Sequence, residues 1–128
     1  MKNYLLAMSL IGLIASFTAA SPRAVAVDIS GSWVFSVDLD GGGHGDPTFV
    51  FKQEGEKLTG TYSGPLGEQK VTGSVKADNA VFGFEATKDG ETIKATYTAT
   101  IESPTRMTGT IEFNGGEERG KWTGTKKP

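Results

Sequence analysis

Leu58-Thr59-Gly60-Thr61-Tyr62 contains one of four copies of the same short phrase, an apolar or aromatic residue followed by Thr-Gly-Thr or Thr-Gly-Ser. The other copies begin at Val71, Met107 and Trp122. Each copy lies in a run that alternates apolar and polar residues, and such alternation predicts a strand with one buried and one solvent-facing side. The threonines then face outward and the glycines inward, where a missing side chain lets a sheet bend sharply or a ring pack over bare backbone. Four such strands in so short a chain predict a tightly coiled, closed β-barrel.

The same alternation, punctuated by turn residues, extends over the rest of the chain and predicts no helix after Ala26. The expected strands are residues 33–39, 48–53, 57–63, 68–76, 80–88, 91–101, 106–114 and 118–126. Asp89-Gly90 is a strong signal for a two-residue hairpin. Simple up-and-down order would leave the first and last strands as open edges, so we expect them to pair. The predicted fold class is all-β, an eight-stranded antiparallel up-and-down barrel.

The first 26 residues have the pattern of a signal peptide. Lys2 precedes an apolar stretch at residues 5–17 that is too short to span a bilayer, and cleavage is expected after Ala26 or Ala20. No Cys follows that could carry a lipid anchor. We therefore expect a single barrel domain at residues 27–128, exported to the periplasm or secreted, with no membrane insertion after cleavage.

The composition excludes several classes of function. The chain contains no Cys, so it has no thiol catalysis, thiol redox chemistry or zinc–thiolate site. Without Lys2 and Arg23, eleven basic and fifteen acidic side chains remain, a net charge of −4 with His neutral, and both signs are scattered along the chain. A nucleic-acid surface needs clustered Lys and Arg, so nucleic acid is not expected as a partner.

The inward positions are mostly aromatic and branched aliphatic, which predicts a packed core below, at most, a small apolar cup. The residues expected to point inward include Trp33, Phe35, Phe51, Leu58, Tyr62, Phe82, Phe84, Tyr97, Ile111 and Trp122. The connections at residues 40–47, 64–67, 89–90 and 114–117 all emerge at one end, and two of them are rich in glycine. We expect this end to be the mouth through which a ligand enters.

One polar cluster stands out, the loop containing Asp38, Asp40, His44 and Asp46. Converging oxygens and an imidazole can bind a cation, so these residues are the weak candidates for a metal site. The spacing matches no complete calcium-loop signature, and Asp-Gly pairs are ordinary turn chemistry. The alternative is a solvated loop, and we expect no metal and no other cofactor.

Gly31-Ser32-Trp33 at the start of the first strand resembles the Gly-x-Trp signature of the calycins, the superfamily of lipocalins, fatty-acid-binding proteins and avidins. The resemblance implies that Trp33 closes the bottom of the barrel and that a basic residue near the end of the last strand, Lys126 or Lys121, packs over it. Leu58-Thr59-Gly60-Thr61-Tyr62 is similar to the third strand of the avidins, which implies that Tyr62 and Trp122 belong to a ligand pocket. The chain has Phe35 and Gly64 where the avidin pattern has polar residues, and most biotin-pocket residues have no counterpart.

The residues that pair a large apolar body with a polar tip are the candidates for ligand binding: Tyr62, Tyr97 and Trp122. The alternative reading of both tyrosines is that of core residues whose hydroxyls bond within the protein. No nucleophile–base pair is visible, so we do not expect an enzyme. The expected function is a non-catalytic exported barrel that binds a small apolar or amphipathic molecule. The other open reading is a protein-binding module, such as an exported hydrolase inhibitor, that acts on an extracellular protein through its mouth loops.

Overall fold

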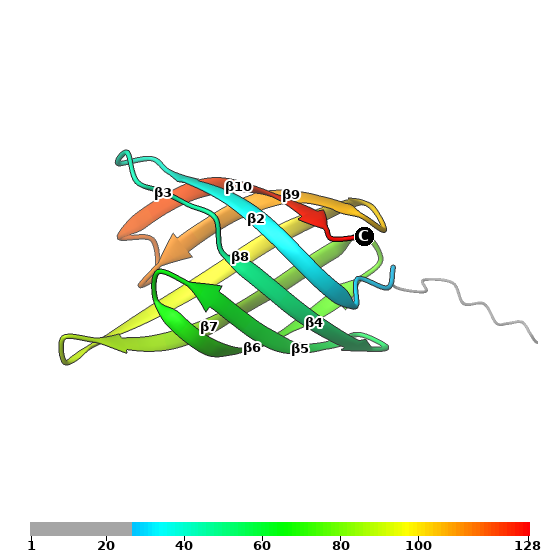
Figure 1. Cartoon of the computed structure of the whole chain (residues 1–128), viewed down its shortest axis with the longest axis horizontal. Helices are drawn as coiled ribbons and strands as arrows, with labels where there is room; N and C mark the ends of the chain where they lie inside the picture. Colours follow the sequence, from blue (N-terminus) through cyan, green and yellow to red (C-terminus); the bar gives the residue numbers. More distant parts are fainter. Residues whose placement is uncertain (1–26) are drawn as a thin grey trace, which may run out of the picture.

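The computed structural model describes residues 27–128, and the expected signal peptide lies outside them. The described chain forms one closed sheet of eight long antiparallel strands and one very short strand, shown in Figure 1. The strands are β2 (Gly31–Leu39), β3 (His44–Gly45), β4 (Thr48–Glu54), β5 (Lys57–Gly64), β6 (Gly67–Lys76), β7 (Asn79–Lys88), β8 (Glu91–Ser103), β9 (Arg106–Phe113) and β10 (Glu118–Lys126). No helix of the described residues is long and apolar enough to cross a membrane.

Pairing of the first and last long strands closes the barrel, as the sequence predicts. β10 lies antiparallel to β2, with Trp122 opposite Val37 and Lys126 opposite Trp33. Every other long strand pairs with its neighbours in the chain. Closure removes the free edges that would otherwise invite aggregation.

The short strand β3 is the one element of the sheet that the sequence analysis missed. After the turn at residues 40–43 the chain folds back along β2, so that Gly45 pairs with Val37 and His44 with Asp38. A two-residue strand in a glycine-rich loop carries no alternation, which is why the pattern gave no signal. Its effect is to hold this loop against the rim of the barrel.

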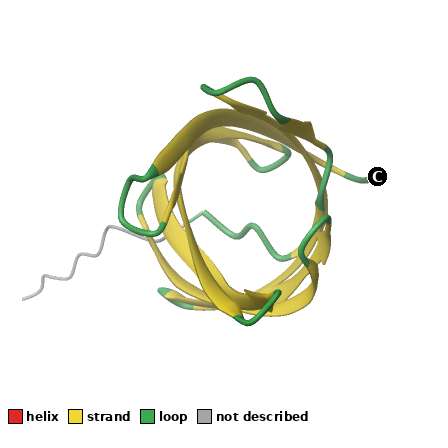
Figure 2. Ribbon diagram, turned by 90° about the vertical axis from the view of Figure 1, so that its left-hand side faces the viewer, coloured by secondary structure: helices red, strands yellow, loops and turns green. Residues whose placement is uncertain are grey.

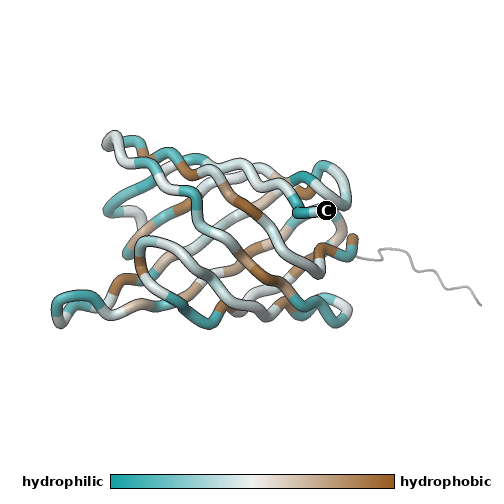
Figure 3. The backbone as a smooth tube through the Cα atoms, in the orientation of Figure 1, coloured by the Kyte–Doolittle hydropathy of each residue, from teal (hydrophilic) through white to brown (hydrophobic). Residues whose placement is uncertain are grey.

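The predicted inward residues form the core. All ten of the residues expected to point inward are buried. Phe35 stacks on Trp122 with ring centroids 4.3 Å apart, and it lies 4.4 Å from Phe49. Figure 3 shows the hydropathic alternation along the strands and the hydrophilic residues at the turns. Burial of this aromatic cluster is the main stabilising contribution to a domain without disulfides.

The chain before β2 closes one end of the barrel, which we call the floor end. Figure 2 looks in from the opposite, mouth end and shows the chain crossing the far opening just after the grey residues. Ile29 is completely buried there. Its carbonyl accepts a hydrogen bond of 2.9 Å from Trp33 Nε1, and its N–H donates to Gln53 Oε1 at 2.9 Å. The floor is therefore a hydrogen-bonded plug over the aromatic core.

The inward glycines have both of the roles that the sequence allows: some let neighbouring backbones approach closely, and others let a ring pack over bare backbone. At Gly109 an added Cβ would overlap the Thr98 carbonyl oxygen of β8, so the two backbones are too close for any side chain. At Gly124 an added Cβ would lie 2.8 Å from Phe35 Cε1, so here a ring packs over bare backbone. Both arrangements tighten the coil of the small barrel.

The two residues that carry the calycin resemblance lie beside each other at the floor end. Trp33 is completely buried, and Lys126 stands opposite it on β10. An added Cβ at Gly31 would lie 2.6 Å from Lys126 Cε, so the lysine stem covers this glycine. Lys121, the other candidate, is exposed and stands opposite Asp38, away from Trp33. These contacts agree with the barrel fold. The likeness to the calycins remains a resemblance.

Candidate functional site

The mouth end contains a cup that opens to solvent. It is a cavity of about 950 Å³ whose inner wall is mostly apolar, and its rim comes from the loop after β2 and from the turns that join β5 to β6 and β9 to β10. The apolar wall residues include Val37, Leu66, Ile93, Ile111 and Phe113. A cavity of this size and lining is typical of a small-molecule site. The barrel is thus filled with rings at its floor end and hollow at its mouth.

Tyr62 and Tyr97 both line the cup, from β5 and β8. Each is almost completely buried, with 3 % and 2 % of its surface exposed. The Tyr62 hydroxyl accepts a long hydrogen bond of 3.4 Å from the Leu66 N–H. Among residues 27–128, none forms a hydrogen bond with the Tyr97 hydroxyl. A buried hydroxyl without a partner is costly, so this group is the most informative polar feature of the cup.

Both phenols stay protonated in the cup. Burial raises the pKa of Tyr97 far above its usual value, and the nearby Tyr62 hydroxyl raises it further. Burial also raises the pKa of Tyr62, against the lowering effect of the Leu66 N–H. The two hydroxyls are therefore neutral at any physiological pH, and each has an O–H that can be donated to a guest molecule.

Trp122, the third candidate, does not belong to the cup wall. It is 2 % exposed, its ring stacks on Phe35, and its Nε1–H donates to the Thr110 carbonyl at 2.9 Å. The structure thus brings Tyr62 and Tyr97 together at the cup and places Trp122 in the packed layer. Its only N–H is already used within the protein.

The strands β6 and β7 part toward the mouth. Their ladder runs from Lys76 opposite Asn79 only as far as Thr72 opposite Gly83. Beyond it, the ring of Phe84 on β7 packs 4.3 Å from the ring of Tyr62 on β5. Tyr62 itself is held by ladders on both sides, opposite Phe49 on β4 and Gln69 on β6, and its contact with Phe84 joins the two sides of the parted wall.

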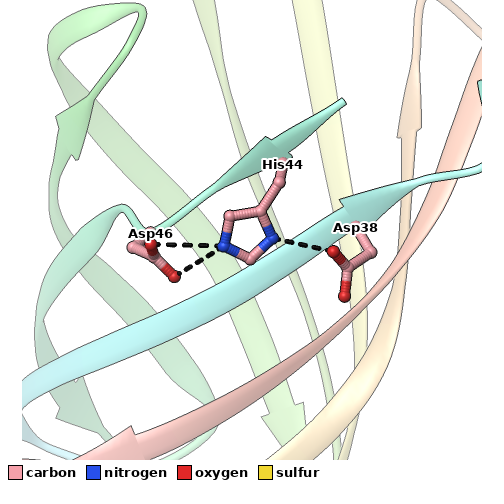
Figure 4. Close-up of polar contacts among 3 residues, drawn as sticks. All are labelled: Asp38, His44 and Asp46. Atoms are coloured by element: carbon pink, nitrogen blue, oxygen red, sulfur yellow. Dashed lines mark hydrogen bonds and ion pairs between the residues drawn. The ribbon is translucent and has the colours of Figure 1, made fainter. Parts of the chain in front are cut away.

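His44 is held between two carboxylates on the outside of the rim (Figure 4). Its Nδ1 lies 2.7 Å from Asp38 Oδ1, and its Nε2 lies 3.1 Å from Asp46 Oδ1. The hydrogen bond to Asp38 and the charge of Asp46 raise the pKa of His44 above its usual 6.5. Both ring nitrogens are occupied by carboxylates, so His44 acts as a structural contact between β3 and β2. Neither nitrogen contacts a hydroxyl that it could activate as a nucleophile.

The metal candidates do not converge. Asp40 lies apart from the His44 contact and lines the cup, and its backbone N–H donates to the Arg119 carbonyl at 2.8 Å. Within the described part of the chain, no group of three or more His, Asp or Glu side chains is arranged to hold a metal ion.

Sequence reasoning placed the loops that form the rim of the cup but did not identify its apolar wall. Ile111 was expected to point inward, and Val37 and Ile93 lie at apolar positions of the same alternation, but nothing in the alternation separates a residue beside a cavity from one inside a packed core. The usable signal was position, because these residues lie near the mouth ends of their strands. Gly45 gave no signal, yet it faces the cup with its nearest neighbour, Pro65 Cγ, 3.7 Å from an added Cβ.

No protein-family model matches this sequence, and none of the curated proteins compared with it matches. Solved structures do. A redesigned β-barrel, b11L5F_LGL, aligns with a TM-score of 0.64 at 16% identity over 78% of this chain and 92% of its own. The redesigned barrel mFAP0, bound to DFHBI, aligns with 0.57 at 18% identity over 77% and 98%. EF1p2_mFAP2b, also bound to DFHBI, aligns with 0.56 at 15% identity over 78% and 94%. At this identity the likeness is one of fold, and the chain is an eight-stranded antiparallel β-barrel of the same shape as these proteins.

Proposed function

We propose that this protein is a non-catalytic binding protein that takes a small apolar or amphipathic molecule into the cup at its mouth. The observation that carries the proposal is the contrast inside one barrel. An open cavity of about 950 Å³, with apolar residues in its inner wall, lies above a buried aromatic core, and a buried phenol in its wall has no hydrogen-bond partner in the described protein. A guest that fills the cavity and accepts a hydrogen bond from the Tyr97 hydroxyl would satisfy that group.

Two further points support the proposal. Two of the similar barrels are found with the small dye DFHBI, so a barrel of this size has room for a guest of that kind. The N-terminal pattern favours an exported protein, and we place the binding outside the cytoplasm on that ground.

The test is a titration with N-phenyl-1-naphthylamine, an uncharged probe whose fluorescence rises in apolar surroundings. We expect saturable binding by the wild-type protein. Gly45→Phe should abolish it, because Gly45 lines the cup and an added Cβ there makes only ordinary contacts, with Pro65 and Pro47, so the ring is expected to occupy the mouth. Val50→Phe is the matched control, since Val50 is 53 % exposed on the outer face of β4.

Circular dichroism and thermal unfolding establish that both variants remain folded. Binding lost in Gly45→Phe and retained in Val50→Phe is the expected result. A wild-type protein that does not bind the probe, or equal binding by both variants, would overturn the proposal.

A further inference from the structure

Carboxylates surround the opening of the cup. Asp40 comes from the loop after β2, Glu91 from the start of β8, and Glu117 and Glu118 from the turn and strand that follow β9. All four lie in the wall or rim of the cavity. They come from three separate segments, so the barrel topology gathers them at one opening.

The cations of the rim are already paired with other groups. The Nη2 of Arg119 lies 3.8 Å from Glu112 Oε1, and His44 sits between Asp38 and Asp46. Within residues 27–128, none of the four rim carboxylates forms an ion pair. Among the side chains that line the cavity, these four carboxylates outnumber the cations Arg119 and His44, and a cup with low-dielectric walls concentrates the field of the excess negative charge on a molecule that enters.

The inner part of the cup favours an uncharged group, whereas the rim favours a positive charge. Its wall there consists of Val37, Ile111 and the two tyrosines, with no charged side chain among them. The Tyr97 hydroxyl is neutral and lacks a partner in the described chain, so it can donate a hydrogen bond to an acceptor. A charged group placed there would lose its hydration without gaining an opposite charge.

We propose that the cup is selective for amphipathic amines: molecules whose protonated amine stays at the carboxylate rim and whose uncharged inner end accepts a hydrogen bond from Tyr97. This inference rests on the proposed function and specifies its ligand class. Anionic amphiphiles are disfavoured at both ends, by repulsion at the rim and by the lack of an inner cation.

Three dansyl probes test the selectivity, because they share one ring system and one sulfonyl acceptor. Dansylcadaverine carries an amine, dansylamide is uncharged, and dansylglycine carries a carboxylate. At low salt and pH 7.5 we expect the Kd of the amine to be at least about tenfold lower than that of the carboxylate. The difference should shrink in 0.5 M NaCl, because the rim carboxylates are screened.

Two variants connect the selectivity to its residues. The double variant Glu117→Gln, Glu118→Gln should reduce the preference for the amine and leave dansylamide binding unchanged. Glu54→Gln, Glu56→Gln is the matched control, since both residues are exposed at the floor end and should not alter the preference. Tyr97→Phe should weaken all three dansyl probes and leave the binding of N-phenyl-1-naphthylamine, which lacks the sulfonyl acceptor, nearly unchanged.

Failures of the two proposals are distinguishable. If N-phenyl-1-naphthylamine binds in the cup but the amine and carboxylate probes bind equally, or the carboxylate binds better, the charge selectivity is wrong and the binding function stands. If N-phenyl-1-naphthylamine does not bind, the proposed function fails and the selectivity fails with it.

Discussion

The two ends of this barrel are built from the same alternating strands but differ in what fills the interior. At the floor end, the completely buried Ile29 lies over a cluster of buried rings, and the indole N–H of Trp33 is satisfied within the protein. At the mouth end, the walls part around a cavity, and the Tyr97 hydroxyl has no partner in the described chain. The comparison teaches that buried rings are concentrated at one end, whereas the proposed guest would occupy the other.

The largest effect is expected at the floor. Trp33→Ala removes a completely buried ring and its 2.9 Å hydrogen bond to Ile29, and it should lower the free energy of unfolding by about 3–5 kcal/mol. The measurement is urea unfolding followed by circular dichroism. Phe113→Ala at the mouth is the control, and it should cost only about 1 kcal/mol because this ring is half-buried. Equal losses for the two variants would mean that the floor does not dominate stability.

The next effect concerns the coil of the barrel. Gly109→Ala forces a methyl group against the Thr98 carbonyl, and it should destabilise the protein by about 1–3 kcal/mol in the same unfolding measurement. Gly41→Ala in the mouth loop is the control, because its nearest neighbour is a flexible Glu118 oxygen 3.8 Å from the new atom. A neutral Gly109→Ala would show that the strands do not need this close approach.

A smaller change in the free energy of unfolding should distinguish Tyr97 from Trp122, two buried side chains with a polar tip. Tyr97→Phe removes a hydroxyl that has no hydrogen-bond partner within residues 27–128, and it should leave stability unchanged or raise it by up to about 1 kcal/mol. Trp122→Phe loses the hydrogen bond to the Thr110 carbonyl and should lower stability by at least about 1 kcal/mol. A clear loss of stability in Tyr97→Phe would show that its hydroxyl is satisfied in solution and would remove the main reason to assign it to a ligand.

The smallest effect is that of the His44 contact at the rim. Because the pKa of His44 is raised in the folded protein, its stabilising contribution is present below pH 6.5 and is lost as the pH rises through the folded value. A ¹H–¹⁵N NMR titration of the imidazole should give a pKa above 6.5. Asp38→Asn should lower it, and Asp78→Asn at the floor-end turn should not. A pKa of His44 that is unaltered by Asp38→Asn would mean that the two side chains do not meet in solution.

The closed barrel followed from sequence because its determinants are local. The alternation around Gly60 and Gly109 and the turn at Asp89-Gly90 set strands, faces and order, and closure followed from the cost of open edges. The plug at Ile29 and the short strand at His44 did not follow, since neither has a periodic pattern and both depend on contacts with distant strands.

The site was only partly predictable for a related reason. Tyr62 and Tyr97 were chosen because they combine an apolar body with a polar tip, and both line the cup. Trp122 has the same character but is fully packed, because its height in the barrel and its stack on Phe35 depend on strand register. Sequence alternation gives the face of a residue, whereas the boundary between packed core and cavity depends on three-dimensional packing.

The most direct test of this division between floor and mouth is an NMR titration of the ¹⁵N- and ¹³C-methyl-labelled protein with N-phenyl-1-naphthylamine. The account predicts saturable shift changes at Val37, Tyr62, Tyr97 and Ile111, with the signals of Ile29 and Leu58 nearly unchanged. Shift changes centred on the floor or on the outer threonines, or no change at saturating probe, would contradict it.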